Sequence, residues 1–445
     1  MTSAPSASTS ASTSASTAAS TAAAAHPGGA STPAGPPARF ASGIDRNRRI
    51  GRTLRLVARI EHEDDALLAR IAQAMRERDE PGARLAKAMR SRAGEPGRVS
   101  MGQVRRALRE GVASVPDAPP ALVELLAPLE QDPPWLDRDL LERGGRFMRA
   151  LGSNAQDVLL QLSLVGGYRF AGPTDLLVAT GGLTGATTRR RLAETQHWGA
   201  VIGRAGALLP PAPGRPAGEG WRLTTHVRVM HALVNHAFES EPSRWDVERW
   251  GLPINQADQA STLGLFDGVL LLGARGLGVP VSRADARAVM HLWRYVGWLL
   301  GVDDDFLVDS ERERHRINYH LLLAQAPLSE AGRQLAQAVV AMQAERRRPR
   351  LPAVLQPLWT RFERERLLSM LTVFLGPRSM RELGLGVRPP WAHAYLVPLN
   401  TLRYRVLDRL PGGRARRIAW GEARADHLLA TYFAGEQQDV GGLAV

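Results

Sequence analysis

The 445-residue sequence contains no cysteine at all. The chain therefore has no disulfide framework, no cysteine nucleophile, no cysteine-held iron–sulfur cluster and no thiolate-ligated haem. A haem attached covalently through cysteines is excluded for the same reason. Any metal must be held by histidine, carboxylate or backbone groups, or belong to an organic cofactor.

Several other signatures are absent too. The sequence has no phosphate-binding loop, no dinucleotide glycine fingerprint, no G-x-S-x-G elbow and no H-E-x-x-H, which argues against nucleotide-dependent, hydrolytic and zinc-peptidase functions. No run of about 18 uninterrupted apolar residues predicts a transmembrane helix. The most apolar stretch, 263–281, contains Asp267 and Arg275. Because no secretion signal is recognisable either, we expect a cytoplasmic protein.

The charge is unbalanced, with 57 basic against 44 acidic residues and a net charge of +13. The arginines are scattered, and no recognisable nucleic-acid module accompanies them. Solvated arginine-rich helix faces explain this pattern, so we expect no nucleic-acid partner. Peripheral attachment to an anionic membrane surface stays open.

Composition divides the chain into four segments. Residues 1–42 are almost entirely Ala, Ser, Thr, Pro and Gly, which predicts a disordered low-complexity tail. Residues 43–135 form a charged helical extension, 136–345 a dense helical domain, and 346–445 a further helical extension that packs on the core. Apolar spacing of three and four predicts an all-α fold with the following main helices: 138–165, 186–206, 222–239, 256–277, 283–301 and 329–345.

Three histidines, His226, His231 and His236, follow one another at intervals of five. Each interval turns about 140° around a helix, so the three do not converge on one metal ion. His231 has largely apolar neighbours, and Arg228 lies three residues before it on the same face. It is either a core histidine or a single axial haem ligand, since a porphyrin supplies four nitrogens itself.

A second polar patch lies in TTRRRLAETQHW, residues 187–198. Arg191 and Thr195 are four residues apart and share a helix face. Glu194 beside them could act as a base or a polar gate if it is buried, and is otherwise an ordinary solvated carboxylate.

The stretch WDVERWGLPINQADQASTLGLFDGVLLLGARGLGV, residues 245–279, begins polar and becomes apolar. Pro253 marks a boundary, and Asn255 is suited to cap a helix that starts near Gln256. The apolar part, 263–279, is expected to pack into the core.

Five phrases in order resemble one family, the oxygenases that include the bacterial latex clearing proteins (rubber oxygenases) and the MpaB-type oxygenase. They are LVATGGL at 177–183, RRRLAET at 189–195, HVRVMHALV at 226–234, WGLPINQADQASTLGLFDGVLLLGARGLGV at 250–279 and HLWRYVGWLLGVDDDF at 291–306. The resemblance covers roughly residues 135–345, with a weaker continuation at 374–385.

This resemblance implies a globin-like helical core around a b-type haem, with His231 as the ligand to its iron. Arg191 and Arg228 match arginines near the haem, and Thr195 matches a threonine there. Asp175 lies where the family places a candidate catalytic carboxylate. Oxygen and a hydrophobic small-molecule or polyisoprenoid substrate are then the expected partners.

One position departs from the family pattern. Rubber oxygenases can carry a lysine directly before the threonine, able to cap the distal side of the iron. Here the residue is Glu194, which cannot serve as the same neutral nitrogen ligand.

The sequence thus favours a haem b-dependent oxygenase that cleaves a C=C bond of an isoprenoid-like or unsaturated lipid substrate. Two alternatives remain open: a non-catalytic haem-binding or haem-sensing protein, and a haem-free helical scaffold at a membrane surface.

Overall fold

The computed structural model describes residues 35–181, 186–344 and 351–433, without the side chains of 186–193, 343–344 and 424–433. The expected disorder of 1–42 concerns mainly residues outside this range. The helices of the N-terminal half are α1 (Ile44–Ile50), α2 (Arg52–Ala58), α3 (Asp65–Ala74), α4 (Glu80–Arg90), α5 (Met101–Glu110), α6 (Pro120–Leu126), α7 (Arg138–Leu151), α8 (Ser153–Val158), the π-helix Leu159–Val165, α9 (Pro173–Ala179) and α10 (Ala186–Ile202).

The second half is helical as well. Its helices are α11 (Glu219–Glu239), α12 (Val247–Trp250), α13 (Gln256–Phe266), α14 (Gly268–Gly276), α15 (Arg283–Leu299), α16 (Glu311–Ala324), α17 (Glu330–Ala344), α18 (Gln356–Glu382, kinked at Gly376), α19 (Trp391–Arg405) and α20 (Gly413–Phe433). In the described ranges the only β-type pairing is two isolated bridges, so the all-α prediction is confirmed. None of the described helices combines the length and the apolar character that crossing a bilayer demands.

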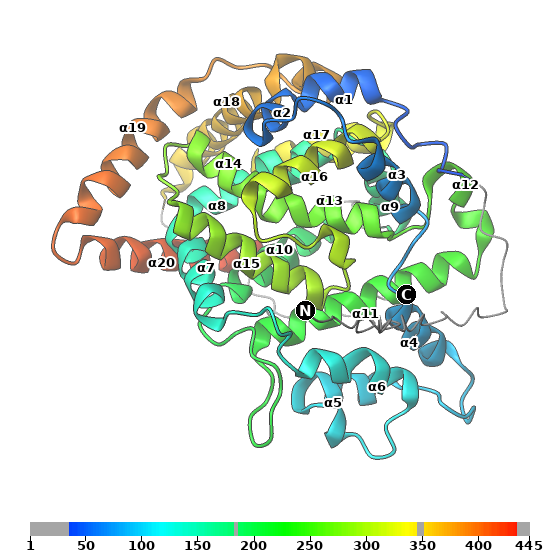
Figure 1. Ribbon diagram of the computed structural model, residues 1–445. Helices are drawn as coiled ribbons and strands as arrows, with labels where there is room; N and C mark the ends of the chain where they lie inside the picture. Colours follow the sequence, from blue (N-terminus) through cyan, green and yellow to red (C-terminus); the bar gives the residue numbers. More distant parts are fainter. Residues whose placement is uncertain (1–34, 182–185, 345–350, 434–445) are drawn as a thin grey trace, which may run out of the picture. The chain divides into compact units, whose positions relative to one another are not determined.

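The centre of the fold is built on α13, α15 and α16, which contact one another, while α15 also packs on α7 and α11 (Figure 1). Helix α15 carries the aromatic residues of this core: Trp293 and Tyr295 are completely buried. Trp293 stacks on Phe266 of α13 with ring centroids 5.0 Å apart, and both rings meet Trp198 of α10 edge-on. Aromatic contacts therefore join three helices that are far apart in the sequence.

The flanking helices pack on this centre rather than standing apart. Helix α4 lies against α11, α2 lies against α16, and α20 contacts both α7 and α10. The described residues from Gly35 onward form one compact unit. A second apolar cluster joins the π-helix to α17 and α18, with Leu160, Leu368 and Leu371 at its centre.

The stretch 245–279 begins its helix as predicted. The Asn255 side chain accepts a hydrogen bond from the backbone N–H of Asp258 at 2.9 Å, so Asn255 is the N-cap and α13 begins at Gln256. Its amide also donates to the Asp258 carboxylate at 2.7 Å. Ser282 caps α15 in the same way, with the N–H of Asp285 as donor.

The single helix predicted over 256–277 is wrong, because the chain breaks at Asp267. This residue has φ −105° and ψ −91°, and its carboxylate accepts a hydrogen bond from the N–H of Gly268, which starts α14. The other carboxylate oxygen lies 2.7 Å from Nε of Arg314 in α16, and both side chains have 0% exposure. Apolar periodicity continues through the break, so the pattern alone conceals it.

The predicted helix over 138–165 is also interrupted. Gly152 adopts φ +53° between α7 and α8, a conformation that favours glycine, and a Cβ atom there would meet the backbone of Gly421 at 3.0 Å. From Leu159 the helix widens into a π-helix. Both irregularities lie near the cavity described below.

We predict that Asp267→Asn lowers the free energy of unfolding by about 3–5 kcal/mol, because it leaves the Arg314 guanidinium buried without a counter-charge. The amide oxygen still accepts from Gly268, so the change tests the charge rather than the cap. Urea denaturation measures the loss. Asp45→Asn, in an exposed pair with Arg48, is the control and changes stability by less than about 0.5 kcal/mol. A loss of less than about 1 kcal/mol for Asp267→Asn would contradict the assignment.

Candidate active site

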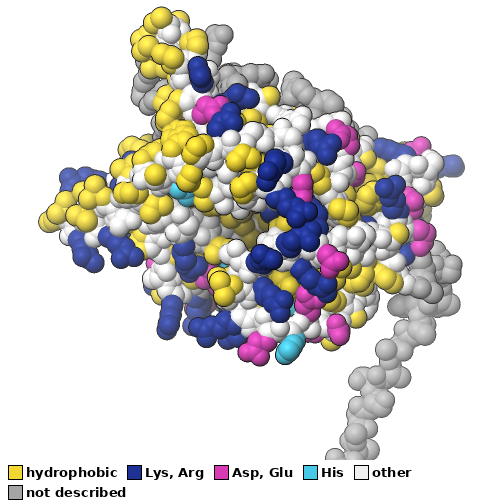
Figure 2. Space-filling model, turned by 90° about the horizontal axis from the view of Figure 1, so that it is seen from above, with side chains coloured by type: hydrophobic (Ala, Val, Ile, Leu, Met, Phe, Trp, Pro, Cys, Tyr) yellow, Lys and Arg dark blue, Asp and Glu magenta, His cyan; other side chains and the backbone are white. Residues whose placement is uncertain are grey.

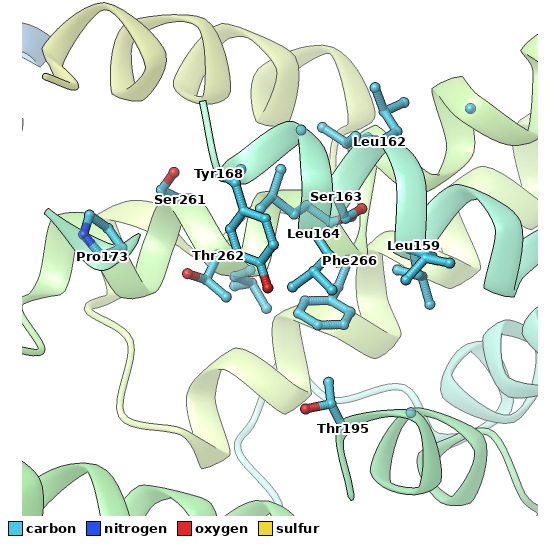
Figure 3. Close-up of a pocket in the computed structure, with 18 of the residues that line it drawn as sticks. Leu159, Leu162, Ser163, Leu164, Tyr168, Pro173, Thr195, Ser261, Thr262 and Phe266 are labelled. Atoms are coloured by element: carbon cyan, nitrogen blue, oxygen red, sulfur yellow. The ribbon is translucent and has the colours of Figure 1, made fainter. Parts of the chain in front are cut away.

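A cavity of about 1480 Å³ opens among α1, the π-helix, α9, α10, α11, α13, α14 and α18. Most of its lining is apolar, and its volume exceeds the roughly 300–1,000 Å³ of ordinary small-ligand pockets. The close-up of the cavity shows Ser163 and Leu164 of the π-helix above the Phe266 ring and Thr195 below it (Figure 3). The space suits a long hydrocarbon or a large planar cofactor.

The π-helix supplies one wall through Leu159, Leu162 and Leu164. The hydroxyl of Ser163 donates to the carbonyl of Leu265 at 2.7 Å, which ties this wall to α13. Such π-turns within helices occur frequently at functional sites.

His231 lies on α11, and its side chain lines the cavity. Its buried Nδ1 atom has no hydrogen-bond partner among the described residues. Burial lowers the pKa of His231 below its usual 6.5, although hydrogen bonding to Gln259 and the charge of Asp79 partly oppose this effect. The imidazole is therefore neutral near pH 7, which is the form that coordinates a metal.

Arg228, one turn before His231, is engaged elsewhere in the described structure. Its Nε and Nη2 atoms donate to the two carboxylate oxygens of Asp79, each at 2.7 Å. Asp79 precedes α4, so this bidentate pair fastens α4 to α11. Arg228 is 9% exposed and is not part of the cavity wall.

The predicted α10 patch reaches the cavity in part. Glu194 and Thr195 both line it, with Glu194 partly buried and Thr195 exposed. The side chain of Arg191 lies outside the described residues, so its predicted position beside Thr195 stays a prediction.

Asp175 makes a local hydrogen bond at the start of a helix. Its carboxylate accepts a hydrogen bond from the backbone N–H of Gly172 at 3.2 Å, at the start of α9. Its neighbours Thr174 and Leu176 line the cavity, but Asp175 does not. Its catalytic role stays a prediction.

Several cavity residues were not predicted from the sequence. Tyr168 follows the π-helix, and its hydroxyl points into the space between Thr262 and Phe266 (Figure 3). Burial raises the pKa of Tyr168, so its hydroxyl keeps its proton. Gln259 lies one turn into α13 and faces His231. The nearest signal was the polar face of QADQ, residues 256–259, which a buried helix does not ordinarily carry.

The wall also contains a buried ion pair. Asp258 lines the cavity, and its carboxylate lies 2.5 Å from Nη2 of Arg39, which is 3% exposed. Arg39 additionally donates to the carbonyl of Trp250 at 2.6 Å. The segment before α1 is thereby anchored against α13.

Fold and site together define the catalytic domain of an oxygenase family. The family model described as ER-bound oxygenase mpaB/B'/rubber oxygenase, catalytic domain, matches residues 153–408, more than half of the chain. The chain belongs to this family, and the resemblance drawn from the sequence is confirmed. The match begins at 153, later than the expected 135, and runs past 345 to 408, so that it includes α18 and α19.

Two relatives illustrate the similarity. A rubber oxygenase from Streptomyces sp. (strain K30) is 28% identical over 214 residues, 46% of this chain and 50% of the relative. The chain thus matches about half the length of that curated relative. A structure of latex clearing protein LCP in the closed state superposes with a TM-score of 0.60 at 23% identity, over 83% of this chain and 94% of the other. That likeness supports the shared fold.

We predict a pH dependence of stability that originates at His231. Because its pKa is below 6.5 when folded and about 6.5 when unfolded, the unfolded chain binds the proton first and the free energy of unfolding falls as the pH drops below 6.5. His231→Gln removes this contribution, so its stability declines less steeply between about pH 6.5 and 5.5. Urea denaturation at several pH values measures both slopes. Identical slopes in the two proteins would exclude a buried neutral His231.

Proposed function

We propose that the protein is a haem b-dependent oxygenase that oxidatively cleaves a C=C bond of a hydrophobic, isoprenoid-like or unsaturated lipid substrate. The observation that carries the proposal is His231, a neutral histidine whose Nδ1 lacks a partner, in the wall of a large apolar cavity. Family membership supplies the class of reaction.

The residues present fit a haem. Among the described residues no group of three or more His, Asp or Glu side chains is arranged to hold a metal ion. A haem requires only one protein ligand, because the porphyrin supplies four nitrogens, and His231 would provide it. When bound, the haem would supply the iron that activates O₂.

The chain's own contribution is the environment around that ligand. The leucines of the π-helix and the Phe266 ring exclude water and hold a hydrocarbon chain by apolar contact. The protonated Tyr168 hydroxyl can donate one hydrogen bond into the same space. Thr195 adds a second hydroxyl to the opposite wall.

Glu194 is proposed to shape the distal side. It lines the cavity at the position where relatives can carry a lysine. A carboxylate there would not reproduce a neutral nitrogen ligand, so Glu194 would leave this part of the cavity open to water or O₂. In its protonated form Glu194 would instead deliver a proton at its carboxyl oxygen.

Arg228 and Arg191 are the proposed partners of the haem propionates. Arg228 lies outside the cavity wall and makes two 2.7 Å hydrogen bonds to Asp79. To reach a propionate it would have to share or break these bonds. Haem binding would then weaken the ion pair between Arg228 and Asp79, and with it the attachment of α4 to α11.

The first experiment is the visible spectrum of the purified, haem-reconstituted protein with a pyridine haemochrome assay. We expect b-type haem near one per chain in the wild type and loss of most of it in His231→Ala. His236→Ala is the matched control: this histidine lies on the same helix but outside the cavity, and its removal leaves haem content unchanged. Full haem in His231→Ala would refute the ligand assignment.

Oxygen consumption with unsaturated isoprenoids under air tests the activity. We expect aldehyde or ketone cleavage products from the wild type and at least a 100-fold lower rate (on the order of 3 kcal/mol in transition-state stabilisation) from His231→Ala. A haem-loaded wild type without turnover of any unsaturated lipid would instead favour a haem-sensing protein.

A further inference from the structure

One charged group in the cavity has no counter-ion. Arg169 follows the π-helix, lines the cavity and is only 9% exposed. Its Nε donates to the carbonyl of Gly166 at 2.8 Å, and no carboxylate lies within ion-pair distance among the described residues. A buried charge without a partner is costly, so evolution usually removes it or pairs it. We therefore expect a bound ligand to provide the counter-ion of Arg169.

A second guanidinium lies beside the first. Arg46 of α1 and Arg169 both approach the ring of Phe170, at 5.7 and 5.5 Å from its centroid. Burial and the positive charge of Arg46 together lower the pKa of Arg169 to about 10, with Glu382 in partial opposition. Arg169 is nevertheless still charged at pH 7, and the two cations repel each other.

The carboxylate of Glu382 does not neutralise this end of the cavity. It pairs with Arg46 at 2.7 Å and with Arg378 at 3.3 Å. Arg49 also lines the cavity here and is exposed. Four arginines thus face one carboxylate. The view from above α1 and α18 shows many Lys and Arg side chains over this face of the molecule, with hydrophobic side chains beside them (Figure 2).

The rest of the cavity wall is mostly apolar, and its arginines are paired with carboxylates. Of the charged groups in its wall away from this end, Asp258 is bound to Arg39, Arg149 to Glu422 and Arg204 to Glu219, while Glu194 is partly buried. Between them lie the leucines of the π-helix and Phe266. A large, mostly apolar cavity with unneutralised cations in one part of its wall matches an amphiphile rather than a neutral hydrocarbon.

We propose that Arg169, with Arg46 beside it, binds the anionic head of an amphiphilic substrate, a carboxylate on a long hydrocarbon chain, and that the chain extends along the apolar cavity. The proposal rests on the proposed function for the reaction, but binding itself needs neither haem nor oxygen. Carboxylate oxygens match the guanidinium fork and form charge-assisted hydrogen bonds. They would supply the missing counter-charge of Arg169.

The test compares two ligands of equal chain length, oleate and oleyl alcohol, by isothermal titration with the full-length protein below their micelle concentrations. We expect the wild type to prefer oleate roughly 10- to 100-fold, the range of a charge-assisted hydrogen bond. Arg169→Met removes this preference and leaves the affinity for the alcohol unchanged. Arg169→Lys, which retains the charge, retains part of the preference.

Thermal unfolding of the ligand-free protein distinguishes a ligand-binding role of Arg169 from a structural one. Because Arg169 is an unpaired buried cation, Arg169→Met is expected to unfold at the same or a higher temperature than the wild type. A clear fall in melting temperature with equal loss of both ligands would overturn the proposal and make Arg169 a structural residue. Arg204→Met is the matched control: Arg204 also lines the cavity but is paired with Glu219 at 3.4 Å, and its loss leaves the oleate preference intact.

Haem propionates carry the same carboxylate chemistry, so a haem titration forms the second arm. If Arg169→Met weakens haem binding while the oleate preference persists, the arginine serves the cofactor and the substrate-head proposal is overturned. A wild type without any preference for oleate overturns it whether or not the variants fold. Failure of haem loading with a retained oleate preference would refute the proposed function and leave this inference standing.

Discussion

The buried ion pair between Asp267 and Arg314 is the constraint on which the rest of the site depends. With both side chains removed from water, neither charge can be lost alone without a large cost. The pair holds α16 against the point where α13 ends and α14 begins. Residues on both sides of that break, Phe266 and Val269 among them, face the cavity. The apolar wall is thus positioned by a polar contact behind it.

A cavity of this size needs rigid borders, since an apolar core tends to collapse into any empty space. Three polar ties hold the borders here: Arg39 to Asp258, Arg228 to Asp79, and Ser163 to the carbonyl of Leu265. Each joins elements distant in the sequence. In the cavity wall, the Nδ1 atom of His231 has no hydrogen-bond partner and the guanidinium of Arg169 has no counter-ion among the described residues, and we assign both groups to ligands.

Much of the fold could be read from the sequence because helix periodicity and caps are local. Asn255 caps the helix expected of it, and the phrases that indicated the oxygenase family lie within the matched domain. His231 stood out because a histidine among apolar neighbours needs an explanation. The break at Asp267 and the π-helix could not be predicted, since the apolar pattern continues through both. Nor could the engagement of Arg228 by Asp79, which is 149 residues away.

The sequence by itself determined the helical class, the absence of thiol chemistry, the family and a short set of candidate residues, because these follow from composition and local spacing. The tertiary structure alone decided which candidates share a cavity. Glu194, Thr195 and His231 line the same cavity. Asp175 accepts a hydrogen bond at the start of α9, and Arg169 has no counter-ion among the described residues. The physical reason is that burial and charge pairing depend on neighbours brought together only by folding.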